Sequence, residues 1–123
     1  MTRRDVTHAN NPAFECDPSV LLLPFGRHAY LEEIVGRCQG ERVELDETTD
    51  RIVHRLRCVV PPITLVYSGM GAPAAVNALE VARANGARRV VVLGACGGIS
   101  PDLKVGELVV PTAAVRGEGA SRY

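Results

Sequence analysis

The stretch Ile63-Thr-Leu-Val-Tyr-Ser-Gly-Met-Gly-Ala-Pro-Ala74 decides the fold. Its first five residues favour a strand, and they run directly into a glycine loop. Pro73 suits the first turn of a helix, where the N–H that proline lacks has no partner in any case. Small apolar residues then recur at helical spacing as far as Ala82, and Gly86 is placed to end the helix. The stretch therefore predicts a strand, a glycine loop and a helix in succession.

A second unit of the same kind follows. Arg89-Val-Val-Val-Leu93 predicts a strand, and Gly94-Ala-Cys-Gly-Gly98 a second glycine loop. Continuous Val/Leu runs indicate a parallel sheet covered on both faces, built through a right-handed crossover. We expect one further strand at Glu107-Leu-Val-Val-Pro111, after a turn region.

Toward the N-terminus the pattern is weaker. Residues 1–19 are polar and interrupted by prolines, which predicts a flexible N-terminal arm. The elements expected next are a buried strand over Val20–Leu23, a helix over His28–Arg37, an acidic turn over Gly40–Thr49 and a strand over Arg51–Val60, ended by Pro61-Pro62. The prediction is thus an α/β fold, a mostly parallel mixed sheet flanked by helices, in one domain over residues 20–123.

Composition excludes several classes of protein. The 14 acidic and 14 basic residues balance, so no nucleic acid or membrane is expected as a partner. The apolar runs are too short to cross a bilayer, and residues 1–8 resemble no export signal, which favours a cytoplasmic location. The four cysteines form no CxxC pair, and there are only three histidines. We therefore predict no metal site and no disulfide framework. Apart from Cys96, which lies in the second glycine loop, the thiols are expected to be buried or indifferent.

The two glycine loops suggest a ligand site. We expect both at the carboxyl ends of adjacent strands, where open parallel sheets bind ligands. Gly69-Met-Gly71 precedes a helix N-terminus, which favours an anion, and Gly94–Gly98 would let a ligand approach the backbone closely. Neither GxGxxG nor GxxxxGK[ST] is present, which counts against dinucleotide and ATP binding. The alternative is that these glycines only form tight turns.

Four segments carry a family resemblance. Tyr67-Ser-Gly-Met-Gly-Ala-Pro-Ala74, Val90-Val-Val-Leu-Gly-Ala-Cys-Gly-Gly-Ile99, Leu103-Lys-Val-Gly-Glu-Leu-Val-Val-Pro111 and Val115-Arg-Gly-Glu-Gly-Ala-Ser121 resemble consecutive landmarks of the purine/uridine phosphorylase family. The similarity covers residues 20–123, the N-terminal part of a nucleoside phosphorylase domain. It implies phosphate attack on the anomeric carbon of a nucleoside, giving ribose 1-phosphate and free base. It also implies no metal or organic cofactor, inorganic phosphate as co-substrate, and a homo-oligomer built from dimers.

The resemblance also suggests roles for single residues. Phosphate would be bound by Gly26 and Arg27 after the first strand, by Arg51 lent to a neighbouring subunit, and by Gly94 and Ala95. The nucleoside and its ribose would be contacted by Met70 with Gly69 and Gly71, by Cys96 and Gly97, and by His8 from across the dimer. Each has a plainer alternative: Met70 as a gap filler, Arg27 as a solvated side chain, His8 as part of a loose arm. No catalytic residue is assigned.

Two positions depart from the family pattern. Phosphate-using members commonly carry an arginine two residues before the first glycine of the second loop, and a Ser or Thr after that glycine. Here these positions are Val92 and Ala95. The sequence also lacks the family's Glu-Met-Glu-like ribose segment and leaves Glu118 as the only nearby acid, so the domain is expected to be truncated after its first half. Two alternatives therefore stay open: a hydrolytic nucleosidase of the same fold, or an inactive fragment that only binds ligand or partner subunits.

Overall fold

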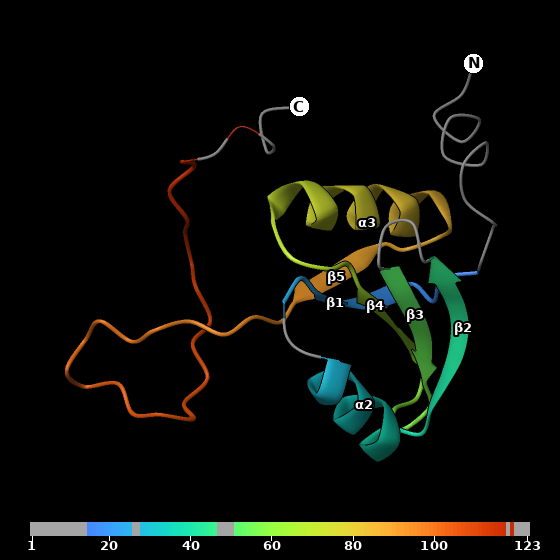
Figure 1. Ribbon diagram of the computed structural model, residues 1–123, viewed down its shortest axis with the longest axis horizontal. Helices are drawn as coiled ribbons and strands as arrows, with labels where there is room; N and C mark the ends of the chain where they lie inside the picture. Colours follow the sequence, from blue (N-terminus) through green and yellow to red (C-terminus); the bar gives the residue numbers. More distant parts are fainter. Residues whose placement is uncertain (1–14, 26–27, 47–50, 118, 120–123) are drawn as a thin grey trace.

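The computed structural model describes residues 15–25, 28–46, 51–117 and 119, and shows a five-stranded sheet with one helix on each face (Figure 1). The elements in chain order are β1 Ser19–Leu23, α2 His28–Arg37, β2 Gly40–Asp46, β3 Arg51–Leu56, β4 Ile63–Tyr67, α3 Ala72–Ala84 and β5 Arg89–Val92. The strand order across the sheet is β2-β3-β4-β1-β5. The α/β class and the mixed sheet are confirmed.

The centre of the sheet is parallel and one side is antiparallel. β1 pairs in parallel with β4 and with β5, so that Leu22 lies opposite both Val66 and Val92. β3 pairs antiparallel with β4, and β2 with β3. The carboxyl ends of β4, β1 and β5 therefore lie at one edge, together with the start of β3. Both glycine loops and the residues after β1, which the sequence analysis predicts to bind ligand, leave the sheet at this edge.

Side-chain alternation along the strands separates two cores. On the α3 face, residues of the three middle strands pack against Ala78, Val81 and Ala82, which recur one helical turn apart. On the α2 face, a second cluster forms around Leu31, with Ile34 and Val35 packed against it. The strand residues of the first cluster are Val20, Leu22, Val53 and Val66; those of the second are Leu23, Ile52, Leu56, Leu65 and Tyr67. Apart from Tyr67, the strand residues of both cores are aliphatic, as the scarcity of aromatic residues predicts.

Helix α3 begins and ends as the sequence predicts. It starts after Gly71, whose φ of 102° suits glycine, with Pro73 in the first turn. At the other end, Ala87 N donates to Ala82 O at 3.0 Å and Gly86 N to Arg83 O at 3.3 Å. These two bonds form a Schellman motif around Gly86, whose φ is 115°. The sharp stop returns the chain to the sheet at β5.

Two sequence predictions of secondary structure are wrong. The segment expected to be a turn forms β2, because its residues from Gly40 to Asp46 complete an antiparallel hairpin with β3. The strand expected over Glu107–Pro111 is absent from the described residues, because that segment has no neighbouring strand with which to pair. The strand predicted over Arg51–Val60 forms, but it ends at Leu56.

The order of the strands also differs from expectation. β4 and β5, which precede the two glycine loops, are not adjacent, because β1 lies between them. Ser68 N donates to Leu23 O at 3.2 Å and Leu93 N to Leu22 O at 2.9 Å, so both loops leave the sheet beside the end of β1. The loops are thus separated by one strand, and the β1–α2 connection begins between them.

The two ends of the described chain behave differently. Residues 15–18, at the end of the predicted arm, are attached to the domain: Cys16 N donates to Asn85 O, and Thr64 Oγ1 donates to the Asp17 carboxylate at 2.8 Å. Residues 94–117 instead run away from the sheet as an extended segment (Figure 1). In the part of the chain that the structure describes, neither helix is long and apolar enough to cross a membrane.

Candidate functional site

Two cavities flank the carboxyl edge of the parallel strands, one on each face of the sheet. The cavity on the α3 face has a volume of about 320 Å³ and is lined by Arg51, Ser68, Pro73, Ala74, Asn77 and Ala78. The cavity on the α2 face has a volume of about 390 Å³ and is lined by Leu23, Phe25, Tyr30, Leu31, Ile34, Tyr67, Leu93, Gly94 and Ala95. We name them the α3 cavity and the α2 cavity. Their linings differ in chemistry.

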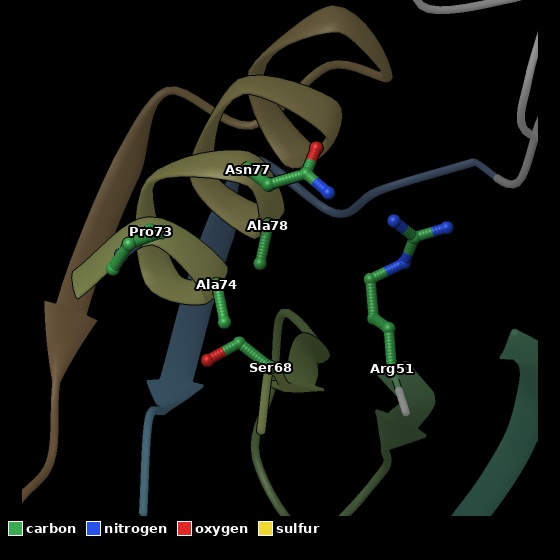
Figure 2. Close-up of a pocket in the computed structure, with 6 residues that line it drawn as sticks. All are labelled: Arg51, Ser68, Pro73, Ala74, Asn77 and Ala78. Atoms are coloured by element: carbon green, nitrogen blue, oxygen red, sulfur yellow. The ribbon is translucent and has the colours of Figure 1, made fainter. Parts of the chain in front are cut away.

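The α3 cavity combines a buried cation with a helix N-terminus. Arg51 is the first residue of β3, and because β3 is antiparallel to β4 it lies beside the end of that strand. Its side chain is only 1% exposed. In Figure 2 the Arg51 guanidinium and the Asn77 amide extend toward the same space, while Ser68 and Ala74 lie below it. A planar guanidinium presents several N–H donors in one plane and therefore suits an oxyanion.

Ser68 and the glycine loop connect β4 to α3. The Ser68 side chain is buried and its Oγ donates to Gly69 O at 3.1 Å. Gly69 and Gly71 both have positive φ, at 73° and 102°, which turns the backbone sharply into α3. The first N–H groups of a helix have no acceptor within the helix, and the helix dipole adds partial positive charge there. The α3 cavity therefore has the donors and the charge to bind an anion.

The α2 cavity is apolar and partly aromatic. Tyr67 ends β4, Phe25 lies just beyond the end of β1, and Tyr30 comes from the first turn of α2. The second glycine loop contributes Gly94 and Ala95, which add no polar side-chain group. An aromatic and aliphatic slot of this size suits a flat, largely apolar ring. Tyr30 and Phe25 were missed by the sequence reasoning, because an aromatic residue near an apolar helix face also fits simple packing.

The structure places the predicted site residues in three groups. Arg51 lies in the α3 cavity, and Gly94 and Ala95 lie in the α2 cavity. Cys96 and Gly97 line a third space of about 330 Å³ within the extended segment, with Lys104 and Glu107. Met70 lies between its two glycines with its side chain 82% exposed. The remaining predicted site residues, His8, Gly26 and Arg27, lie outside the described residues.

A smaller cavity of about 160 Å³ lies between α2 and the β2–β3 hairpin, lined in part by Glu32, Arg42 and His54. Burial lowers the pKa of His54 below its ordinary value of 6.5, and the positive charge of Arg42 lowers it further. The imidazole is therefore mainly neutral at neutral pH. Among the described residues, no three His, Cys, Asp or Glu side chains are grouped so that they could hold a metal ion.

Known proteins resemble this chain along most of its length. The family model described as the phosphorylase superfamily matches residues 25–123. Uridine phosphorylase of Escherichia coli is 27% identical over 123 residues, all of this chain and 48% of that protein. Uridine phosphorylase of Thermococcus kodakarensis is 38% identical over 61 residues, 50% of this chain and 22% of that protein.

A solved structure is similar in fold as well. Purine nucleoside phosphorylase from Toxoplasma gondii, in complex with immucillin-H, is 25% identical with a TM-score of 0.58, over 68% of this chain and 32% of that one. Against the relatives that match it, the chain spans about half their length or less. The family match begins at residue 25, so it covers the loops after β4 and β5. It includes every residue that lines the α3 cavity and all of those that line the α2 cavity except Leu23. The chain therefore belongs to the phosphorylase superfamily.

Proposed function

We propose that this chain forms the phosphate- and sugar-facing part of a nucleoside phosphorylase. The reaction is phosphorolysis of the N-glycosidic bond of a purine or pyrimidine nucleoside, in which phosphate attacks the anomeric carbon and the base departs. The observation that carries the proposal is the pair of cavities at one sheet edge, one cationic and one apolar, in a chain of this superfamily. Relatives named as uridine, guanosine and purine nucleoside phosphorylases support the reaction class.

The phosphate is assigned to the α3 cavity. Arg51 supplies the fixed positive charge, and the start of α3 supplies backbone donors beside Ser68. Burial of Arg51 strengthens its interaction with an anion, because the surrounding protein screens charge less than water does. Arg51, which the family resemblance lends to a neighbouring subunit's phosphate, lines the α3 cavity here and is kept as a phosphate ligand. Gly26 and Arg27 would complete the phosphate loop after β1.

The nucleoside is assigned to the space that opens from the α2 cavity. The base would lie against Tyr30, Phe25 and Tyr67, and the backbone of Gly94 and Ala95 would border it. Met70, exposed between two glycines, would cover the ribose, with Cys96 and Gly97 on the side of the second loop. Stacking on an aromatic wall does not depend on which base is bound. The proposal therefore covers purines and pyrimidines alike.

A hydrolytic nucleosidase is the second candidate, and the second loop favours it. Val92 ends β5 without a donor group, and Ala95 lines the α2 cavity with a methyl group. These are the positions at which phosphate-using members of the family commonly carry an arginine and a Ser or Thr. Without these donors the second loop adds nothing to phosphate binding in the α3 cavity, and water can take the place of the nucleophile. A third candidate is a chain that binds nucleoside or phosphate, or partner subunits, without turnover.

Release of free base separates the three candidates. The chain is incubated with a panel of purine and pyrimidine nucleosides, with and without inorganic phosphate, and base and ribose 1-phosphate are quantified. Base release that requires phosphate and yields equimolar ribose 1-phosphate supports the phosphorylase. Equal release of base with and without phosphate assigns a nucleosidase. If no nucleoside releases base, the third candidate, a chain that binds without turnover, is supported.

Substitution of Arg51 tests the phosphate assignment directly. We expect Arg51→Met to lower the phosphate-dependent rate by about 10²-fold or more, in line with removal of one charged donor from a site of developing charge. The matched control is Arg83→Met, a cation near the other end of α3. Because a ligand that binds only the folded state raises the unfolding midpoint, phosphate should raise the midpoint of the parent chain and of Arg83→Met but not that of Arg51→Met. An equal rise in all three would exclude Arg51 from phosphate binding.

Three further expectations belong to the same proposal. The protein would act without a metal or organic cofactor, as a homo-oligomer built from dimers, in the cytoplasm. Dialysis against a chelator should leave base release unchanged. Light scattering should give a mass that is an even multiple of the 13.2 kDa chain.

A further inference from the structure

Two cysteines far from the proposed site, Cys38 and Cys58, lie next to each other in the fold. Cys38 follows the last turn of α2, and Cys58 follows the end of β3. The β2–β3 hairpin pairs Gly40 with Leu56, and just beyond that pair Cys58 N donates to Cys38 O at 3.2 Å, so the two cysteines lie opposite each other at the end of the hairpin. We propose that Cys38 and Cys58 are a redox-sensitive pair that forms an intramolecular disulfide with a small disulfide such as oxidised glutathione.

Backbone hydrogen bonds hold the pair in this position. Cys38 O accepts from Cys58 N at 3.2 Å and from Arg57 N at 3.2 Å. Cys38 N is held in turn by Ile34 O at 2.9 Å, which fixes the residue to the end of α2. Residues directly opposite on antiparallel strands have Cα atoms about 4.5–5.5 Å apart, which is within the range that a disulfide spans. The hydrogen bond between Cys58 N and Cys38 O therefore holds the two residues at a backbone spacing that a disulfide can bridge.

The side chains are in contact and accessible. A side-chain hydrogen bond joins the two thiols; this bond, with partial burial, raises the pKa of the Cys38 thiol above its ordinary value. Cys58 is exposed and Cys38 is partly buried. The Arg57 guanidinium, next to Cys58 in the sequence, pairs with the Glu41 carboxylate. Cys58 is thus the thiol that an oxidant reaches first.

The chemistry balances with a small disulfide as the oxidant. The Cys58 thiolate attacks one sulfur of the small disulfide, forms a mixed disulfide and releases one small thiolate. Cys38, as thiolate, then attacks the Cys58 sulfur and releases the second small thiolate. Two protein thiols are oxidised to one disulfide, and one small disulfide is reduced to two thiols.

The other two cysteines cannot join this pair in the folded chain. Cys16 is only 6% exposed and packs in the α3-face core, whereas Cys38 packs against the α2-face core. The sheet therefore separates Cys16 from Cys38. Cys96 lies beyond β5, in the segment over residues 94–117 that follows the last strand of the sheet. Sequence reasoning took Cys38 and Cys58 as buried or indifferent thiols, because their spacing shows no motif and only the fold of the chain brings them together.

The pair lies at the edge of the sheet opposite the two cavities, since β3 ends where β4 begins. A disulfide there would tie the end of α2 to the end of β3. Helix α2 also carries Tyr30, Leu31 and Ile34 of the α2 cavity. Oxidation would therefore restrain α2, which forms one wall of the α2 cavity, without blocking the cavity itself. This regulation does not depend on which reaction the cavity serves.

Peptide mapping after oxidation tests the pair. The full chain is treated with excess oxidised glutathione in native buffer and in denaturant, the remaining thiols are alkylated, and the chain is digested with trypsin without reduction. Cleavage after Arg37, Arg42, Arg57 and Arg83 places the two cysteines in peptides Cys38–Arg42 and Cys58–Arg83, and Cys16 and Cys96 fall in two other peptides. Mass spectrometry then quantifies each linked pair.

The built-in control is the Cys16–Cys38 link, because 22 positions separate these residues and 20 separate Cys38 from Cys58. In denaturant the two links should form within about twofold of each other, since loop closure depends only weakly on length. In native buffer we expect the amount of the Cys38–Cys58 link to exceed that of the Cys16–Cys38 link by about tenfold or more, and the same ratio in the Cys96→Ser variant. In the Cys38→Ser variant no second thiol can displace glutathione, so the mixed disulfide on Cys58 should persist. A native ratio equal to that in denaturant would overturn the proposal. A stable glutathione adduct on Cys58 of the parent chain would do so as well.

Discussion

The apolar runs Ile63–Tyr67 and Glu107–Pro111 are alike in sequence and differ in structure. The first is β4, hydrogen-bonded to β1 on one side and β3 on the other, with Leu65 fully buried. The second forms no strand in the described chain, and its Leu108 is 89% exposed. A run of β-branched and aliphatic residues therefore becomes a strand only where neighbouring strands take up its backbone hydrogen bonds.

β5 is the intermediate case. It pairs with β1 on one side only, and it lies at the edge of the sheet. Its side chains remain largely exposed although three of its four residues, Arg89-Val-Val-Val92, are valines. Burial thus decreases from β4 in the middle of the sheet to β5 at its edge and then to the extended segment. We therefore expect substitutions to lower the free energy of unfolding most in β4, less in β5 and least in the extended segment.

The largest effect is expected from truncating the same side chain in the two runs. Leu65→Ala removes a fully buried side chain and should lower the free energy of unfolding by about 2–5 kcal/mol. Leu108→Ala removes an exposed one and should change it by less than about 0.5 kcal/mol. Urea unfolding followed by circular dichroism measures both. Comparable losses in the two variants would mean that Glu107–Pro111 is packed as β4 is, and the contrast would be lost.

A second pair compares two glycines with positive φ. Gly86 has φ 115°, and an added Cβ would lie 3.3 Å from Cys16 O; Gly106 has φ 92° with nothing within 4 Å. Gly86→Ala should lower the free energy of unfolding by about 1–2 kcal/mol, because the residue closes the Schellman motif that ends α3. Gly106→Ala should have a much smaller effect, since the local strain can relax in the extended segment. The same urea titrations check this, and a larger loss at Gly106 would contradict the difference between the regions.

The elements that sequence reasoning found are those with strong local signals. The glycine loop and proline at the start of α3, and Gly86 at its end, determine that helix within a few residues. β2 was missed because Gly40–Asp46 is mostly charged, and only pairing with β3 makes it a strand. Tertiary context outweighs residue preference there.

The arrangement in space was less predictable than the elements. Nothing local in the sequence shows that β1 inserts between β4 and β5, because strand order depends on contacts between segments far apart in the chain. The same limit applies to the candidate site. Arg51 and the glycine loops could be nominated from motifs, but Asn77 and Tyr30 join the cavities only through the packing of α3 and α2 against the sheet.

The smallest effect concerns the protonation of His54, which lies in β3 within the packed region. Burial, and secondarily Arg42, keep its folded pKa below the ordinary 6.5, so the unfolded chain takes up a proton at a higher pH than the folded chain does. Stability is therefore fully present above about pH 6.5 and falls as the pH is lowered toward the folded pKa, below which the contribution of His54 levels off. Urea unfolding at pH 7.5, 6.5 and 5.5 should show this fall, and His54→Gln should reduce it. If the parent chain and His54→Gln lost stability equally over this range, the proton uptake would have to be assigned to groups other than this buried imidazole.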